Sequence, residues 1–167
     1  MYLGYQNGKI KFYTEQPLNQ TMYNLDLVEE TENEYILVGD EYVLSNSEQA
    51  LEQERGKYIA INDDLRDKAL IGGVTYQNVL FDSDTDQKVN LLATVNMLSD
   101  EDTILWFGMD NQGLLCTKAD LIAIGGLITE LHSFCWNMNA HIKEQIAGAQ
   151  TLEELAEIEI SYDRADT

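Results

Sequence analysis

The chain has 167 residues, of which 44% are hydrophobic and 24% are charged, enough for one domain with a core and a small appendage. Its 30 acidic residues outnumber the 10 basic ones, so the formal net charge is −20 at pH 7. This charge argues against partners that need a basic face, namely nucleic acid and anionic membrane surfaces. The sequence also predicts no secretory signal and no membrane span.

The first 45 residues predict a small antiparallel β-module. Two aromatic-rich stretches flank Asn7-Gly8, a dipeptide favoured in tight hairpin turns. Further strands are expected at 25–28, 35–38 and 42–44. Such short strands cannot bury both faces of a sheet, so we expect the module 1–45 to pack on something else and to serve as a docking unit.

A connector helix is expected over 46–72. Ser45, Asn46 and Ser47 are candidates for its N-cap, and Gly72-Gly73 provides a stop signal. Between them the apolar residues recur at helical spacing but form only one narrow stripe. This pattern is typical of a helix that joins two parts of a chain.

The remaining residues, 73–160, predict a C-terminal domain of two β-hairpins and two main helices. The hairpins are expected to turn at Gln77-Asn78 and at 110–113. The first helix is expected over 84–98, with apolar residues at Val89, Leu91, Leu92, Val95 and Leu98. The fold class is therefore α+β: a small N-terminal antiparallel β-module, a connector helix, and a C-terminal domain of two β-hairpins packed with two main helices.

Thr117 is expected to cap the second main helix, which runs to about residue 148. A capping box at 151–154 predicts a short last helix. The final residues, 161–167, are expected to form a frayed tail.

The long helix carries the most regular pattern of the chain, because its apolar residues alternate steps of three and four over three heptads. This spacing predicts either an interface with a second subunit or partner, or ordinary packing into the chain's own core. The candidate interface residues are Leu121, Ile124, Ile128, Leu131, Met138 and Ile142. Gly125 and Gly126 interrupt the stripe, which indicates close approach of another backbone or a break in the helix.

The motifs that bind metal ions do not fit. An EF-hand loop that starts at Asp82 would need glycine and glutamate where the chain has Gln87 and Ala93. His132 and His141 are spaced to lie on nearly opposite faces of one helix. We therefore expect no metal residues.

Catalytic and cofactor motifs do not fit either, since no nucleophile elbow, phosphate loop or dinucleotide fingerprint is present. Cys116 and Cys135 fit two buried, reduced thiols. We expect no catalytic residues, no cofactor and no enzymatic activity, and a small enzyme remains only as a third hypothesis.

An ordered series of short motifs carries a family resemblance. It comprises 66–76, 79–84, Trp106 with Asp110-Asn111, 117–121 and 151–155. Through these, residues 66–160 resemble a domain of unknown function that is widespread in bacteriophage and prophage proteins and often labelled tail-fibre assembly or tail-fibre-associated. The sequence departs from that family at Val74, where an aromatic residue is usual, and at Gln77-Asn78, where a glycine turn is usual. The N-terminal 65 residues lie outside the resemblance.

The resemblance implies a bacteriophage tail structural protein, associated with the tail fibre or baseplate and acting by protein–protein binding. The alternative is a tail-fibre assembly chaperone that is absent from the mature virion. Its partners would be other phage tail or tail-fibre proteins, and further copies of itself in a homo-oligomer. Its location would be the tail of the virion, with passage through the host cytoplasm during assembly.

Overall fold

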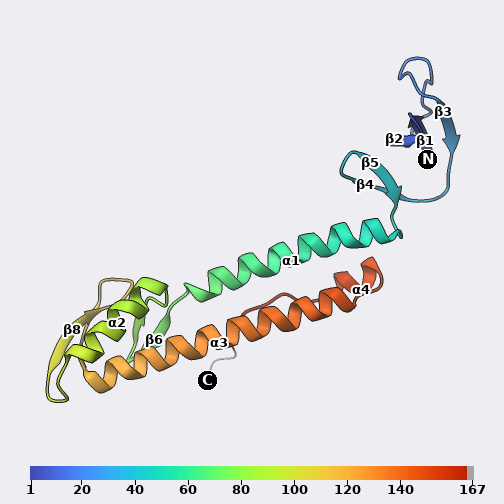
Figure 1. Ribbon diagram of the computed structural model, residues 1–167. Coiled ribbons are helices and arrows are strands. Elements are labelled where there is room, and N and C mark those ends of the chain that lie inside the picture. Colours follow the sequence, from blue (N-terminus) through green and yellow to red (C-terminus); the bar gives the residue numbers. More distant parts are fainter. Residues whose placement is uncertain (165–167) are drawn as a thin grey trace. The chain divides into compact units, whose positions relative to one another are not determined.

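The computed structural model describes residues 1–164, and its elements follow the chain as shown in Figure 1. The strands are β1 (Tyr2–Gln6), β2 (Lys9–Thr14), β3 (Leu27–Glu30), β4 (Tyr35–Val38), β5 (Glu41–Leu44), β6 (Val74–Tyr76), β7 (Val79–Phe81), β8 (Thr103–Phe107) and β9 (Gly113–Thr117). The helices are α1 (Glu48–Leu70), α2 (Thr85–Met97), α3 (Lys118–Gly148) and α4 (Leu152–Ala156). The predicted α+β fold class is confirmed.

The described chain forms two compact units. Unit 1 comprises Met1–Ile59 and Ile146–Ile158, and unit 2 comprises Ala60–Gln145 and the residues from Glu159 onward. The division differs from the predicted domains 1–45, 46–72 and 73–160, because α1 contributes its first half to unit 1 and its second half to unit 2. The predicted connector is therefore part of both units.

Unit 1 contains the N-terminal strands in two antiparallel sheets. One sheet has the order β2-β1-β3, and β4 pairs with β5 in the other. Asn7 and Gly8 both have positive φ, at 55° and 73°, as the predicted hairpin turn requires. Leu3 and Leu25 are buried, and Gly4 leaves the space beside Leu25 that a β-carbon would fill. The third strand begins at Leu27, slightly later than expected.

The helical part of unit 1 has its own buried residues. They are Ala50, Leu51, Ile146, Ala149 and Leu155. Arg55 ties α1 to the end of α3, because its Nη2 donates to the carbonyl of Ala149 over 2.6 Å. The predicted capping box opens α4, where the backbone N–H of Glu154 donates to Thr151 Oγ1 over 3.1 Å.

Unit 2 has the larger core, which joins both hairpins to α2 and α3. Its fully packed members are Val74, Val79, Phe81, Leu91, Cys116, Leu121, Ile124, Ile128, Leu131 and Cys135. The first hairpin turns at Gln77 and Asn78, whose φ angles of 48° and 65° are those of a tight primed turn. Both cysteines are buried, as predicted, and burial raises the pKa of each thiol.

Local caps set the start of both helices of this core. Asp84 accepts the backbone N–H of Gln87 over 2.7 Å at the start of α2. Thr117 and Asp120 cap α3 reciprocally: Thr117 Oγ1 accepts the N–H of Asp120, and Asp120 Oδ2 accepts the N–H of Thr117. One of the carboxylates next to Asp82, where an EF-hand loop was considered, thus serves as a helix cap.

Gly125 and Gly126 in α3 do not have either of the two roles that the sequence predicted for them. The helix runs unbroken through them from Lys118 to Gly148. A β-carbon at Gly125 would lie 3.1 Å from Leu91 Cδ2, and one at Gly126 would meet nothing within 4 Å. Both expectations, a helix break and a close backbone, were wrong, because the neighbour of Gly125 is a side chain of α2.

The predicted tail at 161–167 is partly described. Residues 161–164 have neither helix nor strand, but Tyr162 packs against the core of unit 2 and its hydroxyl donates to Asn62 Oδ1 over 2.6 Å. This segment is therefore attached at Tyr162 and not frayed there, while 165–167 lie outside the described residues. Within 1–164, no helix has both the length and the apolar character needed to cross a membrane.

Candidate interaction surface

The predicted interface residues of α3 lie mostly in the interior of unit 2. Leu121, Ile124, Ile128 and Leu131 belong to its core, Ile142 is also buried, and Met138 is partly buried. Buried side chains have no exposed area left to offer a second folded subunit. At the five buried positions the heptad spacing therefore reflects packing into the chain's own core, and the predicted interface on them is corrected.

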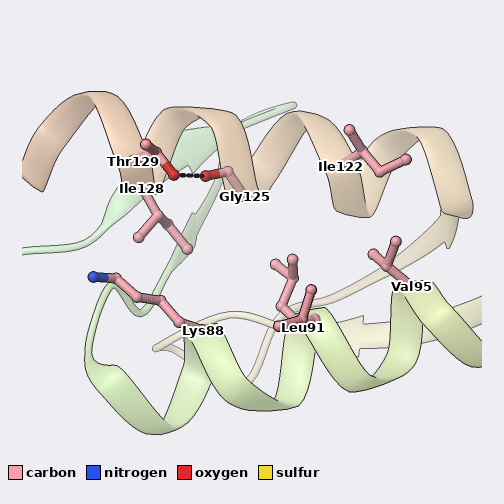
Figure 2. Close-up of a pocket in the computed structure, with 8 residues that line it drawn as sticks. Lys88, Leu91, Val95, Ile122, Gly125, Ile128 and Thr129 are labelled. Atoms are coloured by element: carbon pink, nitrogen blue, oxygen red, sulfur yellow. Dashed lines mark hydrogen bonds between the residues drawn. The ribbon is translucent and has the colours of Figure 1, made fainter.

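A groove of about 310 Å³ lies between α2 and α3 on unit 2. Its lining residues are Lys88, Leu91, Leu92, Val95, Ile122, Gly125, Ile128 and Thr129. Figure 2 shows Leu91 and Val95 of α2 and Ile128 of α3 reaching into the space between the helices, with Lys88 at one end. The groove is therefore mostly apolar, with its cation at one extremity.

The small residue Gly125 and the local bonding of Thr129 shape the wall on α3. Gly125 has no side chain to enter the groove, and Leu91 fills part of the space beside it. The hydroxyl of Thr129 donates to the carbonyl of Gly125 over 2.8 Å, also shown in Figure 2. Because a hydroxyl has one hydrogen to donate, this wall presents no further donor from Thr129.

The rims of the groove are exposed apolar side chains. Leu92 is 63% exposed and Ile122 is 54% exposed, and Val89 lies next to Leu92 on α2 with 61% of its surface exposed. Neither helix carries a charged residue over 89–97 or 121–129. A solvated helix face normally carries charge, so this surface is typical of one that becomes covered. We call the groove lining together with Val89 the groove face.

A second exposed apolar surface covers the outer side of the β8–β9 hairpin. Leu105, Phe107 and Leu115 are 52%, 55% and 64% exposed. Leu105 pairs directly with Leu115 across the two strands. Phe107 pairs with Gly113, which leaves room for the side chains of Leu105 and Phe107 to lie close above it. We call these three exposed residues the hairpin face.

A chain of contacts holds the cationic end of the groove face. Lys88 Nζ lies 2.7 Å from His132 Nδ1, and His132 Nε2 lies 2.9 Å from the carbonyl oxygen of Ser83. An ammonium cannot accept and a carbonyl cannot donate, so in this arrangement Lys88 donates to Nδ1 and Nε2 donates to the carbonyl of Ser83. Lys88 uses one of its three donors in this contact, and within residues 1–164 it forms no ion pair.

Ser83 and His132 lie close together, as a nucleophile and its base would, but their contacts serve the fold. Ser83 is buried, its hydroxyl donates to the carbonyl of Leu70 over 2.6 Å, and it accepts the N–H of Gly73 over 3.1 Å. The hydroxyl thus closes the end of α1, while the histidine contacts the backbone carbonyl of Ser83. A base that activates a nucleophile must reach its hydroxyl, which this ring does not do.

Polar contacts attach the second half of α1 to α3 in unit 2. Asp63 Oδ1 accepts from Arg66, Asn139 and Lys143 over 2.9, 3.0 and 2.8 Å. The hydrogen bond from Lys143 is the main cause that lowers the pKa of Asp63, with smaller contributions from Asn139 and Arg66. Beside them the fully buried Asn62 donates to the carbonyl of Asn139. Among residues 1–164, no three His, Cys, Asp or Glu side chains gather to hold a metal ion.

Sequence comparison places most of the chain in a known family. The family described as Domain of unknown function (DUF4376) matches residues 53–162. The chain belongs to this family. No curated protein and no solved structure matched it.

The DUF4376 match includes every residue of the two apolar faces. It begins within α1 and ends at Tyr162, so it also includes the polar contacts of Asn62 and Asp63. The strands β1–β5 lie outside the match. The groove face and the hairpin face are therefore features of the DUF4376 part of the chain.

The cap at Asp120 predicts a pH dependence for the DUF4376 part. Hydrogen bonds from Thr117, and then one from Tyr76 over 2.7 Å, hold the pKa of Asp120 below its usual value. A lowered folded-state pKa contributes stability above the unfolded pKa of about 3.9, and this contribution is lost as the pH falls through the folded pKa. We expect Asp120→Asn to lower Tm at pH 7, and the difference from wild type to shrink below about pH 4.

The measurement is a Tm series between neutral and acidic pH for both proteins. Asp86→Asn is the matched control, because Asp86 is also near the start of a helix but is exposed and accepts no side-chain hydrogen bond in the described structure. A difference that stays constant over the whole pH range would contradict the role given to ionised Asp120.

Proposed function

We propose that this member of the DUF4376 family is a bacteriophage tail structural protein, associated with the tail fibre or baseplate. It acts by protein–protein binding and not by catalysis. Its partners are other tail or tail-fibre proteins and further copies of itself, and it binds no nucleic acid, membrane or cofactor. It resides in the tail of the virion after passing through the host cytoplasm. The resemblance of residues 66–160 to tail-fibre-associated domains supports the assignment to a tail.

The observation that carries the binding role is the exposed apolar surface of unit 2. Leu92, Ile122, Leu105, Phe107 and Leu115 each expose more than half of their surface in a chain with a net charge of −20. Full burial of such a side chain stabilises by roughly 1.5–3 kcal/mol, so covering these half-exposed residues contributes about 1 kcal/mol each. Together the two faces can supply much of the free energy of a specific contact.

The N-terminal strands of unit 1 offer a surface of a different kind. Seven acidic residues and no Lys or Arg occur from Asp26 to Glu41. Two of them are neutralised locally, since Lys9 pairs with Glu41 and Lys11 pairs with Asp40. The other five carboxylates support the proposal that this module is a docking unit for a basic partner.

The direct test is quantitative mass spectrometry of purified particles of the phage that encodes the chain, with the major tail protein as internal reference. We expect the protein in particles at a fixed, low copy number relative to that reference. If it is abundant in the infected lysate and absent from particles, the structural role is wrong, and an assembly chaperone explains the exposed surface better.

A further inference from the structure

The charges around α2 are arranged asymmetrically. Lys88 lies near its start, no charge follows over 89–97, and its last turn has no basic residue. The turn after the helix then carries three exposed acidic residues, Asp100, Glu101 and Asp102. A helix of this length spans about 20 Å, so the cation and the acidic turn lie at opposite ends of the groove face.

This arrangement is complementary to itself. When two copies of this surface meet about a two-fold axis perpendicular to α2, their α2 helices run antiparallel, and the start of one lies beside the end of the other. Lys88 of each copy then faces the acidic turn of the other copy. The uncharged stretches meet between these two contacts, where two strongly acidic chains would otherwise repel each other.

The contacts within one chain single out Glu101 as the partner of Lys88. Asp100 Oδ1 already lies 3.5 Å from Lys118 Nζ, and Asp102 accepts the N–H of Ser99 over 2.9 Å. Glu101 is exposed between them, and Lys88 has two donors that His132 does not use.

We propose that a second copy of this chain docks on the groove face, with the two α2 helices antiparallel and Lys88 of each copy facing Glu101 of the other. The exposed side chains of Val89 and Leu92 in one copy cover the groove between α2 and α3 in the other. This inference rests on the self-association included in the proposed function and gives it a surface different from the heptad residues of α3.

The first experiment measures the mass of the full chain in solution by analytical ultracentrifugation up to about 100 μM, a range that detects a moderately weak dimer. We expect a dimer. Leu92→Glu is expected to weaken it at least roughly 100-fold, because it buries a carboxylate in an apolar contact. Leu92 is exposed in the single chain, so the Tm extrapolated to the monomer should stay near that of wild type. Ile122→Glu is a second variant of the same kind on α3.

The matched control is Leu115→Glu, which places the same charge on an equally exposed leucine of the hairpin face. This variant is expected to remain a dimer. If Leu115→Glu separates the copies and Leu92→Glu does not, the dimer uses the hairpin face and the inference is wrong.

A second experiment tests the charge pairing. Lys88→Glu and Glu101→Lys are each expected to give monomers, because each homodimer would place like charges together twice. An equimolar mixture of the two variants is expected to restore the dimer, since both contacts between unlike copies become attractive. Failure of the mixture to associate, while wild type dimerises, would overturn the antiparallel pairing.

Separate measurements test the docking of a second copy and the assignment to a phage tail. A wild-type chain that stays monomeric up to about 100 μM overturns self-association through the groove face. The copy number in purified particles tests the tail assignment independently, because a monomer can also be a tail component.

Discussion

Replacing Ile128 with aspartate is expected to unfold unit 2 and not to separate folded subunits. Ile128 is 1% exposed and lies in the core with Leu91, Ile124 and Cys135. An unpaired carboxylate at such a position costs several kcal/mol, which is comparable to the whole stability of 5–15 kcal/mol that is typical of a domain. Circular dichroism and chemical denaturation of the purified variant measure the effect.

The matched control is Ile122→Asp, six residues earlier on the same helix. Ile122 is 54% exposed, so its carboxylate remains solvated in the single chain and the helix should keep its fold. If Ile128→Asp gave a folded monomer with native Tm, the heptad residues would be an interface after all, and their placement in the core would be contradicted.

Replacing Tyr162 with phenylalanine is expected to lower the free energy of unfolding by about 1–3 kcal/mol, the usual cost of an unsatisfied buried polar group. The hydroxyl of Tyr162 donates to Oδ1 of Asn62 over 2.6 Å, and Asn62 is fully buried. Phenylalanine keeps the ring in place but leaves that oxygen without its donor. Burial is also the main cause that raises the pKa of Tyr162.

Chemical denaturation monitored by circular dichroism measures the Tyr162→Phe effect. Tyr23→Phe is the control, since Tyr23 is exposed and its hydroxyl makes no hydrogen bond in the described structure. Equal stability of Tyr162→Phe and Tyr23→Phe would show that the C-terminal segment contributes nothing through Asn62, and that residues around 162 are frayed as the sequence first predicted.

Features that depend on neighbouring residues could be predicted from the sequence. The turns at Asn7-Gly8 and Gln77-Asn78, the cap at Thr117 and the box at 151–154 all depend on side chains within a few residues of each other. For the same reason the hairpins, the main helices and the α+β class could be predicted. The exact start of β3 could not, because strand pairing depends on distant residues.

The contacts that define the site join residues far apart in the chain. Tyr162 meets Asn62, and Lys88 meets His132. Helical spacing indicates which face of a helix is buried but not what covers it. The heptad spacing of the apolar residues in α3 therefore could not show whether a second subunit or the chain's own hairpins and α2 cover them.

The apolar residues of α2 contain one signal in the sequence for the groove face. Val89, Leu91 and Leu92 are apolar residues of α2 whose positions cannot all point to the same side of a helix. In the structure Leu91 is buried, whereas Val89 and Leu92 are exposed. The helix α2 has more apolar residues than its buried side accommodates, and it has no charged residue over 89–97. This combination indicates a second surface of the helix that becomes covered.

The two apolar faces of unit 2 are expected to be contact surfaces in the assembled state. Hydroxyl-radical footprinting, which oxidises exposed side chains, tests this on dilute free chain and on purified particles. We predict that Leu92, Phe107 and Leu115 are oxidised in the free chain and protected in particles, with the radical dose measured on a reporter peptide added to both samples. Equal oxidation of these three residues in both states would contradict the claim.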